Sequence, residues 1–418
     1  MSERRSTTIT RGDLVEMDRR DPLRHFRDRF ELPVGVLYLD GNSLGAMPKA
    51  APGRVHTVVQ DQWGQDLIRS WNKHSWIDLQ QRIGAKIGRL IGARDGETIV
   101  ADSTSVNLFK TLAAALELRP DRRVVVSEAT NFPTDLYIAQ GLLGHLERGH
   151  TMRLADVDDI ESAITEDAAV VMLTHVNYRT GRMYDMRRIT ERAHACGAIM
   201  LWDLSHSAGA VPLDLASAEV DFAVGCGYKY LNGGPGAPAY LYVAQRHQAS
   251  VTPVLSGWLG HASPFLFEPS YSPADGIERM IVGAPPIISL TALEVGVDLM
   301  LEASPEAVRA KSIAQTEMFD ALVTQEIGPD VFTLVTPSAP EQRGSQLCYA
   351  HEDGWPIMRA LIDRGVIGDF RAPDILRFGF TPLYVGYADV WDAVAILKDI
   401  MGARTWDREE YHARMLVT

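Results

Sequence analysis

The chain has 418 residues, 46% of them hydrophobic, and a formal net charge of −13 at pH 7. This length predicts two domains rather than one simple core. The acidic balance argues against nucleic acid as a partner, because phosphate binding relies on a basic face. Three cysteines lie far apart without metal-ligand spacing, which favours reduced thiols and predicts no metal site.

The N-terminal residues 1–8 are polar, and no apolar stretch follows them that would form a signal peptide. No run of the sequence reaches the length of a transmembrane helix. We therefore expect a soluble, cytoplasmic protein with no membrane partner.

Short apolar runs alternate with helical patterns through the first 300 residues. Because these runs are continuously apolar, they predict strands covered on both faces, as in a mainly parallel sheet. The expected strands are 124–126, 169–174, 198–202, 222–224 and 239–243. An amphipathic stretch at 187–196 predicts a helix that stops at Gly197.

The pattern changes after about residue 300. Residues 304–326 and 388–401 predict helices, and 331–336, 345–350 and 374–380 predict strands of a second, smaller layer. The expected architecture is α/β. It has a large domain at 61–300, a small α+β domain at 301–418 and an N-terminal segment at 1–60 that packs with the small domain.

Hydroxyl residues Ser103, Thr104 and Ser105 precede a run of good helix formers that ends at Leu116. Any of the three could cap this helix, and its free N–H groups and positive dipole end could then hold an anion such as phosphate. The alternative interpretation is an ordinary N-cap.

Two further segments follow predicted strands. Asn131–Phe–Pro–Thr–Asp135 presents an aromatic ring that could stack on a flat heterocycle, or it could be a plain turn. Thr174 and Asp203 each close an apolar run, and ligands of open parallel sheets collect at the carboxyl ends of the strands. Both residues therefore point to one crevice.

Lys229 is the only lysine between Lys110 and Lys311, and it lies in a glycine-rich turn. A lone lysine there and a buried acid, Asp203, are typical of a pyridoxal-phosphate (PLP) site. The lysine forms a Schiff base, and the acid keeps the pyridine nitrogen protonated. His206 could reach the cofactor or be a structural histidine. Tyr228, directly before the amine, could bind phosphate or exchange a proton.

Arg377 lies on the strand predicted at 374–380, with Gly379 on the same face and apolar residues on the other. An arginine in this setting suits bidentate capture of a carboxylate. A surface salt bridge is the alternative. The run Gly233–Gly236 lacks the patterns of nucleotide-binding loops, so we set that function aside.

Several motifs together resemble the kynureninase family, whose members are PLP enzymes of the aspartate-aminotransferase fold (fold type I). The resemblance covers residues 35–390. The matching segments are Leu39–Gly45, Asn131–Asp135, Trp202–His206, Gly227–Lys229, Ser256–His261 and Arg377.

The resemblance implies hydrolysis of L-kynurenine to anthranilate and L-alanine by a homodimer. It implies that Lys229 is the Schiff-base lysine and that Asp203 binds the pyridine nitrogen. The other cofactor contacts that it implies come from Thr104, Ser105, Phe132, Pro133, Thr134, Asp135, Thr174, His206, Tyr228, Trp258 and Ala284. Trp258 would act across the subunit boundary, and the substrate would meet Arg377, Gly283 and Asn42.

One position departs from the family pattern. Gly283–Ala284 stands where relatives often carry Asn or Thr, so a side-chain hydrogen bond is lost that the backbone N–H of Ala284 could replace. We expect kynurenine rather than its 3-hydroxy form to be preferred. One alternative function is a cysteine desulfurase or selenocysteine lyase, which would need a nucleophilic cysteine such as Cys348. Another is a PLP-binding protein without turnover.

Overall fold

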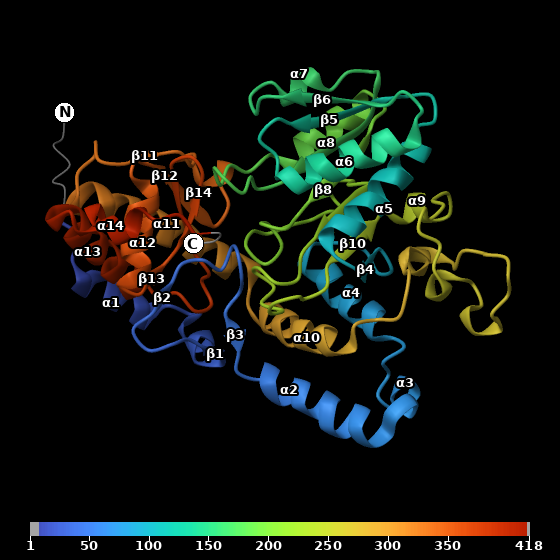
Figure 1. Ribbon diagram of the computed structural model, residues 1–418, viewed down its shortest axis with the longest axis horizontal. Coiled ribbons are helices and arrows are strands. Elements are labelled where there is room, and N and C mark those ends of the chain that lie inside the picture. The colour runs from blue at the N-terminus through green and yellow to red at the C-terminus, as the bar shows by residue number, and fades with distance from the viewer. Residues whose placement is uncertain (1–7, 416–418) are drawn as a thin grey trace. The chain divides into compact units, whose positions relative to one another are not determined.

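A computed structural model describes residues 8–415, and these form two compact units (Figure 1). The first unit contains the chain up to Lys49, the short stretch Arg179–Arg182 and everything from Ala303 onward. The second contains Ala50–Tyr178 and Met183–Glu302. Most of the polar N-terminal segment, in which we expect no signal peptide, lies outside the described residues.

Within the described residues, seven strands of the second unit form one sheet in the order β4-β10-β9-β8-β7-β5-β6. Only β10 runs against its neighbours, so the sheet is mainly parallel, as predicted. The strands are β4 (Thr98–Val100), β5 (Val124–Glu128), β6 (Thr151–Ala155), β7 (Ala168–Thr174), β8 (Ile199–Asp203), β9 (Phe222–Gly225) and β10 (Tyr240–Val243).

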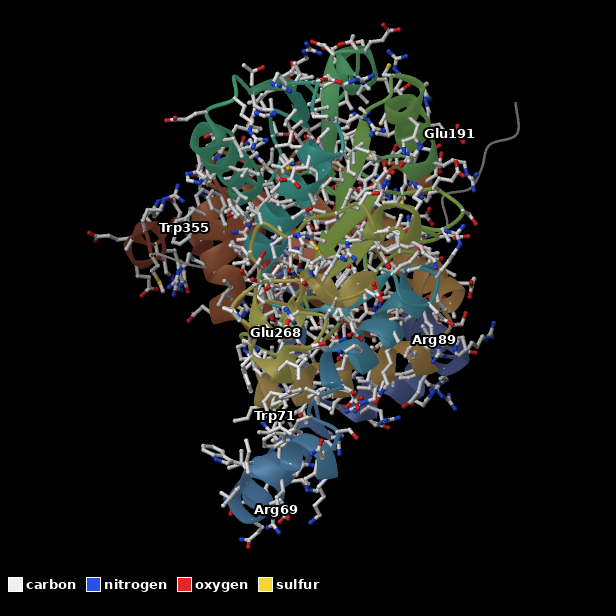
Figure 2. All side chains as sticks on the ribbon, turned by 90° about the vertical axis from the view of Figure 1, so that its right-hand side faces the viewer. Arg69, Trp71, Arg89, Glu191, Glu268 and Trp355 are labelled. Atoms are coloured by element: carbon white, nitrogen blue, oxygen red, sulfur yellow. The ribbon has the colours of Figure 1, made fainter. Side chains whose placement is uncertain are left out.

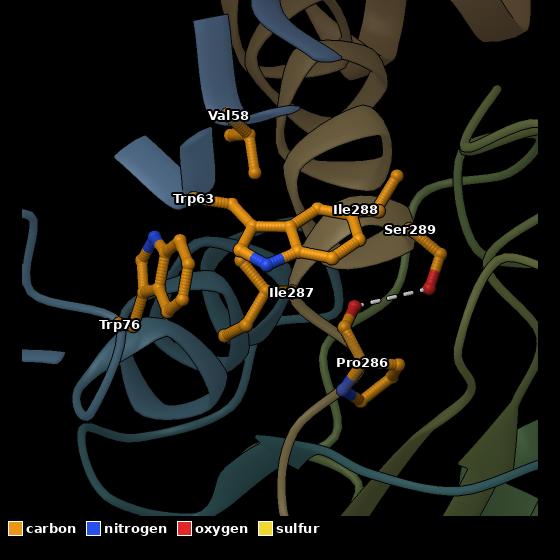
Figure 3. Close-up of a pocket in the computed structure, with 7 residues that line it drawn as sticks. All are labelled: Val58, Trp63, Trp76, Pro286, Ile287, Ile288 and Ser289. Atoms are coloured by element: carbon orange, nitrogen blue, oxygen red, sulfur yellow. Dashed lines mark hydrogen bonds between the residues drawn. The ribbon is translucent and has the colours of Figure 1, made fainter. Parts of the chain in front are cut away.

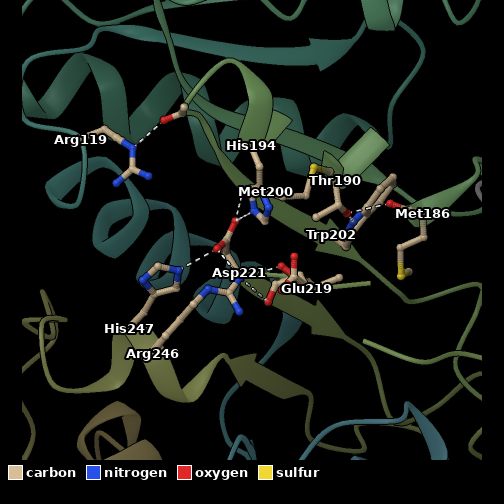
Figure 4. Close-up of polar contacts among 12 residues, drawn as sticks. Arg119, Met186, Thr190, His194, Met200, Trp202, Glu219, Asp221, Arg246 and His247 are labelled. Atoms are coloured by element: carbon tan, nitrogen blue, oxygen red, sulfur yellow. Dashed lines mark hydrogen bonds and ion pairs between the residues drawn. The ribbon is translucent and has the colours of Figure 1, made fainter. Parts of the chain in front are cut away.

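Helices flank this sheet on both faces. Alternate strand residues pack with α5 and α6 in one apolar core, while Trp202 on the other face donates its indole N–H to Thr190 of α8 (Figure 4). The α-helices of this unit are α2 (Ala51–Thr57), α3 (Ser70–Lys73), α4 (Leu79–Leu90), α5 (Thr104–Glu117), α6 (Pro133–Leu146), α7 (Ile160–Ala163), α8 (Met186–Ala195), α9 (Gln245–Gln248) and α10 (Ile287–Glu302).

Between α2 and α3 the chain forms a π-helix, Val58–Asp66, and a short 3₁₀ turn, Leu67–Arg69. Helix α2 contacts α10, and the arm then projects from the unit with Arg69 near its far end (Figure 2). Three more 3₁₀ turns, Trp258–Gly260, Pro264–Leu266 and Gly276–Met280, lie in the long connection between α9 and α10.

The first unit contains a four-stranded antiparallel sheet of order β11-β12-β15-β14 among the described residues. Its elements are α1 (Arg11–Arg20), β1 (Phe30–Glu31), β2 (Leu37–Tyr38), β3 (Met47–Pro48), α11 (Pro305–Glu326), β11 (Thr333–Leu334), β12 (Gln346–Ala350), α12 (Gly354–Asp363), β13 (Val366–Ile367), β14 (Asp369–Arg371), β15 (Ile375–Gly379), α13 (Tyr387–Ala403) and α14 (Glu409–His412). It also has 3₁₀ turns at Arg24–Arg29, Pro340–Gln342 and Thr405–Asp407. The predicted strand at 331–336 shortens to the two residues of β11.

Segments from the N-terminal and C-terminal parts of the chain pack together inside this unit. Strand β2 pairs in parallel with β13, and α1 packs against α13. The loop after β2 is held tightly, because a Cβ on Gly41 would collide with the hydroxyl groups of Thr381 and Tyr384. Across the described residues, no helix combines the length and the apolar character that a membrane span requires.

Candidate active site

Five connections leave the same edge of the large sheet. Strands β4, β5, β7, β8 and β9 all run in one direction, so their carboxyl ends share that edge. The segments that follow these ends carry most of the residues singled out in the sequence. They are Thr104 and Ser105 after β4, Phe132–Asp135 after β5, Thr174 at the end of β7, Asp203 and His206 around the end of β8, and Tyr228 and Lys229 after β9.

Lys229 and His206 meet at this edge. The Lys229 Nζ lies 2.8 Å from Nε2 of His206, which is itself buried. The same Nζ lies 6.0 Å from the ring centre of Phe132 and 5.9 Å from that of Tyr228. Phe132 also makes an edge-to-face contact with Tyr178. The amine therefore stands between two aromatic rings and an imidazole.

Asp203 and Asp135 form a buried carboxyl pair. Strand pairing places Asp203 opposite Thr174, and the Thr174 hydroxyl donates to Asp135 over 3.2 Å. Asp203 accepts the backbone N–H of Ser205 at 2.7 Å. Burial raises the pKa of both carboxyl groups, and the neighbouring Asp203 charge raises the pKa of Asp135 further.

This pair fits the nitrogen end of PLP. Two buried carboxyl groups side by side are costly unless a positive group shares them. A pyridinium N–H is such a group, and Lys229 supplies an amine for the aldehyde at the same edge. Burial also raises the pKa of Tyr228, so its phenol keeps its proton at neutral pH and can donate it.

The phosphate end is matched by the start of α5. Ser103 is the N-cap, and its hydroxyl accepts the N–H of Val106 at 3.3 Å. Thr104 and Ser105 then occupy the first turn, where backbone N–H groups have no partner within the helix. Ser103 is thus an ordinary cap, and the other two hydroxyl groups remain beside an anion-binding helix terminus.

Two predicted residues have no described contact with this cluster. Trp258 is 39% exposed and packs against Phe265 and Phe267, which are also exposed. Ala284 lies exposed before α10, and a Cβ on the neighbouring Gly283 would find open space. Trp258 and Ala284 are therefore exposed rather than part of this cluster.

Arg377 and Asn42 belong to the first unit. Arg377 is only 1% exposed, and its Nε donates to Asp369 at 2.7 Å, so the alternative of a surface salt bridge is wrong. Its Nη2 donates to Ser43 at 2.8 Å. Asn42 is fully buried against Gly379, where any Cβ would collide with its amide oxygen.

Sequence reasoning missed two residues that shape the site. Asn131 accepts from Thr174 and from the backbone N–H of Phe132, which fixes the loop that presents the ring. Glu128 closes β5 and accepts from Asn177 and Tyr184 at 2.9 Å each. An acid at the end of a buried strand was the available signal, the same one that marked Asp203.

The comparisons with known proteins agree with this geometry. A cysteine desulfurase from Thermococcus onnurineus NA1 shares the fold at a TM-score of 0.76 and 18% identity, over 91% of this chain and 98% of its own. A cystine C–S lyase in complex with cysteine persulfide gives 0.76 at 17% identity, over 88% and 98%. At such identities the likeness shows the fold alone, which is that of the fold type I PLP-dependent enzymes.

Sequence relatives define the family. A kynureninase from Pseudomonas fluorescens is 50% identical and one from Burkholderia pseudomallei 51% identical, each over 98% of this chain and all of its own length. A model of the kynureninase C-terminal domain matches residues 308–397, and one of the DegT/DnrJ/EryC1/StrS aminotransferase family matches 73–218. The chain belongs to the kynureninase family, PLP-dependent hydrolases that act on carbon–carbon bonds.

Proposed function

We propose that this enzyme hydrolyses L-kynurenine to anthranilate and L-alanine in the cytoplasm, with 3-hydroxykynurenine as the poorer substrate. The observation that best supports this proposal is the buried Asp135–Asp203 pair, which lies at the same sheet edge as Lys229. Family membership supplies the reaction. The cysteines of the described residues are free and buried, in keeping with a reducing compartment.

Different site residues bind different parts of the cofactor. Asp203 and Asp135 hold the pyridine N–H, and Phe132 covers the ring while Pro133 and Thr134 start the helix that positions it. The first turn of α5, with Thr104 and Ser105, and the phenol of Tyr228 bind the phosphate. Thr174 and His206 complete the edge of the ring site, because the first bonds Asp135 and the second faces the lysine amine.

Bound PLP would supply an electron-accepting ring that makes the proton beside the substrate amine acidic. Lys229 would hold the cofactor through its amine, and the freed amine would remove that α-proton. Water adds to the γ-carbonyl, and the Cβ–Cγ bond breaks. Tyr228 then gives a proton to the β-carbon. Arg377 takes the substrate carboxylate, with Asn42 and Gly283 shaping the substrate site.

The test is product analysis with purified protein, PLP and L-kynurenine. Anthranilate and alanine should form in equal amounts, and Lys229→Ala should abolish multiple turnover. A lower kcat/KM with 3-hydroxykynurenine would support the stated preference. A protein that binds PLP but releases neither product refutes the substrate assignment.

The homodimer is also part of this proposal. Trp63 and Trp76 line an apolar groove of about 470 Å³ with Ile287 and Ile288 at the start of α10 (Figure 3). The exposed cluster around Trp258 adds a second apolar surface in the same unit, with Phe267 75% exposed. Apolar surface of this extent marks an association site. We propose that a second copy of the chain covers it.

A mixing experiment tests whether the partner completes the site. Lys229→Ala and Trp258→Ala should each be nearly inactive alone. After exchange of subunits, about a quarter of wild-type activity should return, because half the dimers are mixed and each mixed dimer has one complete site. No recovery in mixtures shown to contain mixed dimers would contradict a shared site.

The desulfurase alternative lacks support in the structure. It needs a reactive cysteine on an accessible loop, yet Cys348 lies fully buried in β12. Burial raises the pKa of its thiol to about 11. Such a thiol is neither exposed nor ionised at neutral pH.

A further inference from the structure

Lys110 is a buried cation that the proposed chemistry does not use. It lies on α5, and its side chain is fully buried. Its Nζ donates to Asp102 at 2.6 Å and to the backbone carbonyl of Met280 at 2.8 Å. A buried ammonium is costly unless it is paired and hydrogen-bonded, so these two contacts define its place.

Asp102, the anionic partner, has an unusual backbone conformation. Its φ of 49° lies in the left-handed region, which non-glycine residues adopt rarely and at some cost, although Asp and Asn tolerate it better than most. It directly precedes Ser103, the N-cap of α5, and its carbonyl accepts the N–H of Ala239 at 2.9 Å. The turn that sets the direction of the first helical N–H groups is therefore held in a strained form.

Side chains of α5 itself hold this turn. Asn107, fully buried, donates to the carbonyl of Ala101 at 2.7 Å. Lys110 donates to the carboxylate of the following residue, Asp102. The two anchors reach back from one helix to consecutive residues of the turn. Strain of this kind persists where surrounding contacts over-determine it, and it collects at ligand sites.

The second contact of Lys110 extends the arrangement. Met280 ends a 3₁₀ turn whose next residues, Ile281 and Val282, press against Gly260 and Gly257; a Cβ on either glycine would collide with their carbonyl oxygens. These glycines flank Trp258. The Lys110 ammonium thus connects the start of α5 with the segment that packs against the glycines beside Trp258.

We propose that Lys110 is a positioning residue that holds the Asp102 turn so that the first N–H groups of α5 point at the cofactor phosphate. The inference rests on the proposed function, which places the phosphate at this helix terminus. Because its ammonium is bonded to Asp102 and to the Met280 carbonyl, Lys110 acts through the turn. Its loss should therefore weaken recognition of the phosphate group specifically.

Comparing PLP with pyridoxal, the same ring without phosphate, isolates that recognition. Dissociation constants for both would be measured on apo-protein through tryptophan fluorescence and visible absorbance, without substrate. Lys110→Met should lower the affinity for PLP about tenfold or more and leave that for pyridoxal unchanged, since tenfold is the effect of one modest polar contact. Asp102→Asn, which keeps an αL-tolerant residue, should act in the same direction and serves if Lys110→Met fails to fold.

Lys311→Met is the matched control. Lys311 is also a buried lysine, paired with Asp21 at 2.7 Å within the first unit. It should lower thermal stability yet leave the ratio of the two dissociation constants at the wild-type value. A ratio of the two dissociation constants in Lys110→Met equal to that of the wild type, whether or not both affinities fall, would overturn the inference. A shifted ratio in a protein that releases no anthranilate would refute the proposed reaction alone.

Discussion

Asp221, at the amino end of β9, is bonded by four donors, and its removal should be costly (Figure 4). Its carboxylate accepts from the backbone N–H of Met200 at 2.8 Å, from His194 at 2.8 Å, from His247 at 2.7 Å and from Arg246 at 2.6 Å. These donors lie on β8, α8 and α9. The carboxylate therefore fixes the register of β8 and β9 at the edge opposite the site.

The cost of Asp221→Asn follows from this geometry. Asparagine keeps one acceptor oxygen and turns an amide N–H₂ toward the remaining donors, so about half of the donors lose their acceptor. Hydrogen bonds to a charged group are worth about 1.5–3 kcal/mol each. Because Arg246 is 40% exposed, its share is screened by solvent. We expect a loss of about 3–5 kcal/mol in the free energy of unfolding, the range for a broken buried ion pair.

Urea unfolding of the apo-protein, followed by tryptophan fluorescence, would measure this loss. Asp167→Asn is the control, because Asp167 has an ion pair with Arg153 but is 53% exposed and should cost less than about 1 kcal/mol. A loss for Asp221→Asn no greater than that of the control would refute the reasoning.

The pH dependence provides a second check. Burial alone would raise the pKa of Asp221, but hydrogen bonds from His194 and His247 lower it overall. A lowered folded-state pKa adds stability that is present above the unfolded value of about 4 and is lost as the pH falls toward the folded value. The gap between wild type and Asp221→Asn should therefore narrow below about pH 4.

Three further outcomes are expected. Tyr228→Phe should reduce the turnover of kynurenine by about 10²–10⁴-fold in a folded, PLP-loaded protein, and a near-normal steady-state rate would exclude its proton-transfer role. Cys348 should resist alkylation in the native protein at pH 8, as mass spectrometry would show, and Cys348→Ala should keep kynurenine turnover; rapid labelling would contradict its burial. Burial, together with the Asp369 charge, raises the pKa of Asp40 to about 7. Its contribution to stability should be present below about pH 4 and vanish as the pH rises through 7. The Tm of Asp40→Asn should therefore depend less on pH between about 4 and 7 than that of the wild type, and equal slopes in thermal unfolding would contradict this.

The large sheet was predictable because its signal is local. Apolar runs such as 169–174 are strands covered on both faces, and the polar residue that closes each one, Thr174 or Asp203, then lies at a shared edge. Lys229 follows β9, which runs parallel to β8, so strand direction alone brings the lysine to this edge. The site edge therefore followed from chain order and from the rule that ligands collect at carboxyl ends.

Contacts between distant residues were not predictable in this way. The sequence around Arg377 does not show that its Nη2 donates to Ser43, because Ser43 is more than 300 residues away in the chain. The sequence shows Lys110 only as a polar residue in a helix. It gives no sign that the Met280 carbonyl lies beside the ammonium. Such partners depend on how elements pack, and periodicity carries no information about that.

The unit made from both ends of the chain has a consequence for how the protein is made. Synthesis proceeds from the N-terminus, and domains tend to fold as their sequence emerges. The large sheet is complete in sequence once Val243 has been made, whereas β2 must wait for β13 at Val366–Ile367 and α1 for α13. The loop Leu39–Gly45 thus leaves the ribosome before the large sheet is made, yet it reaches its native partners only after that sheet is complete in sequence.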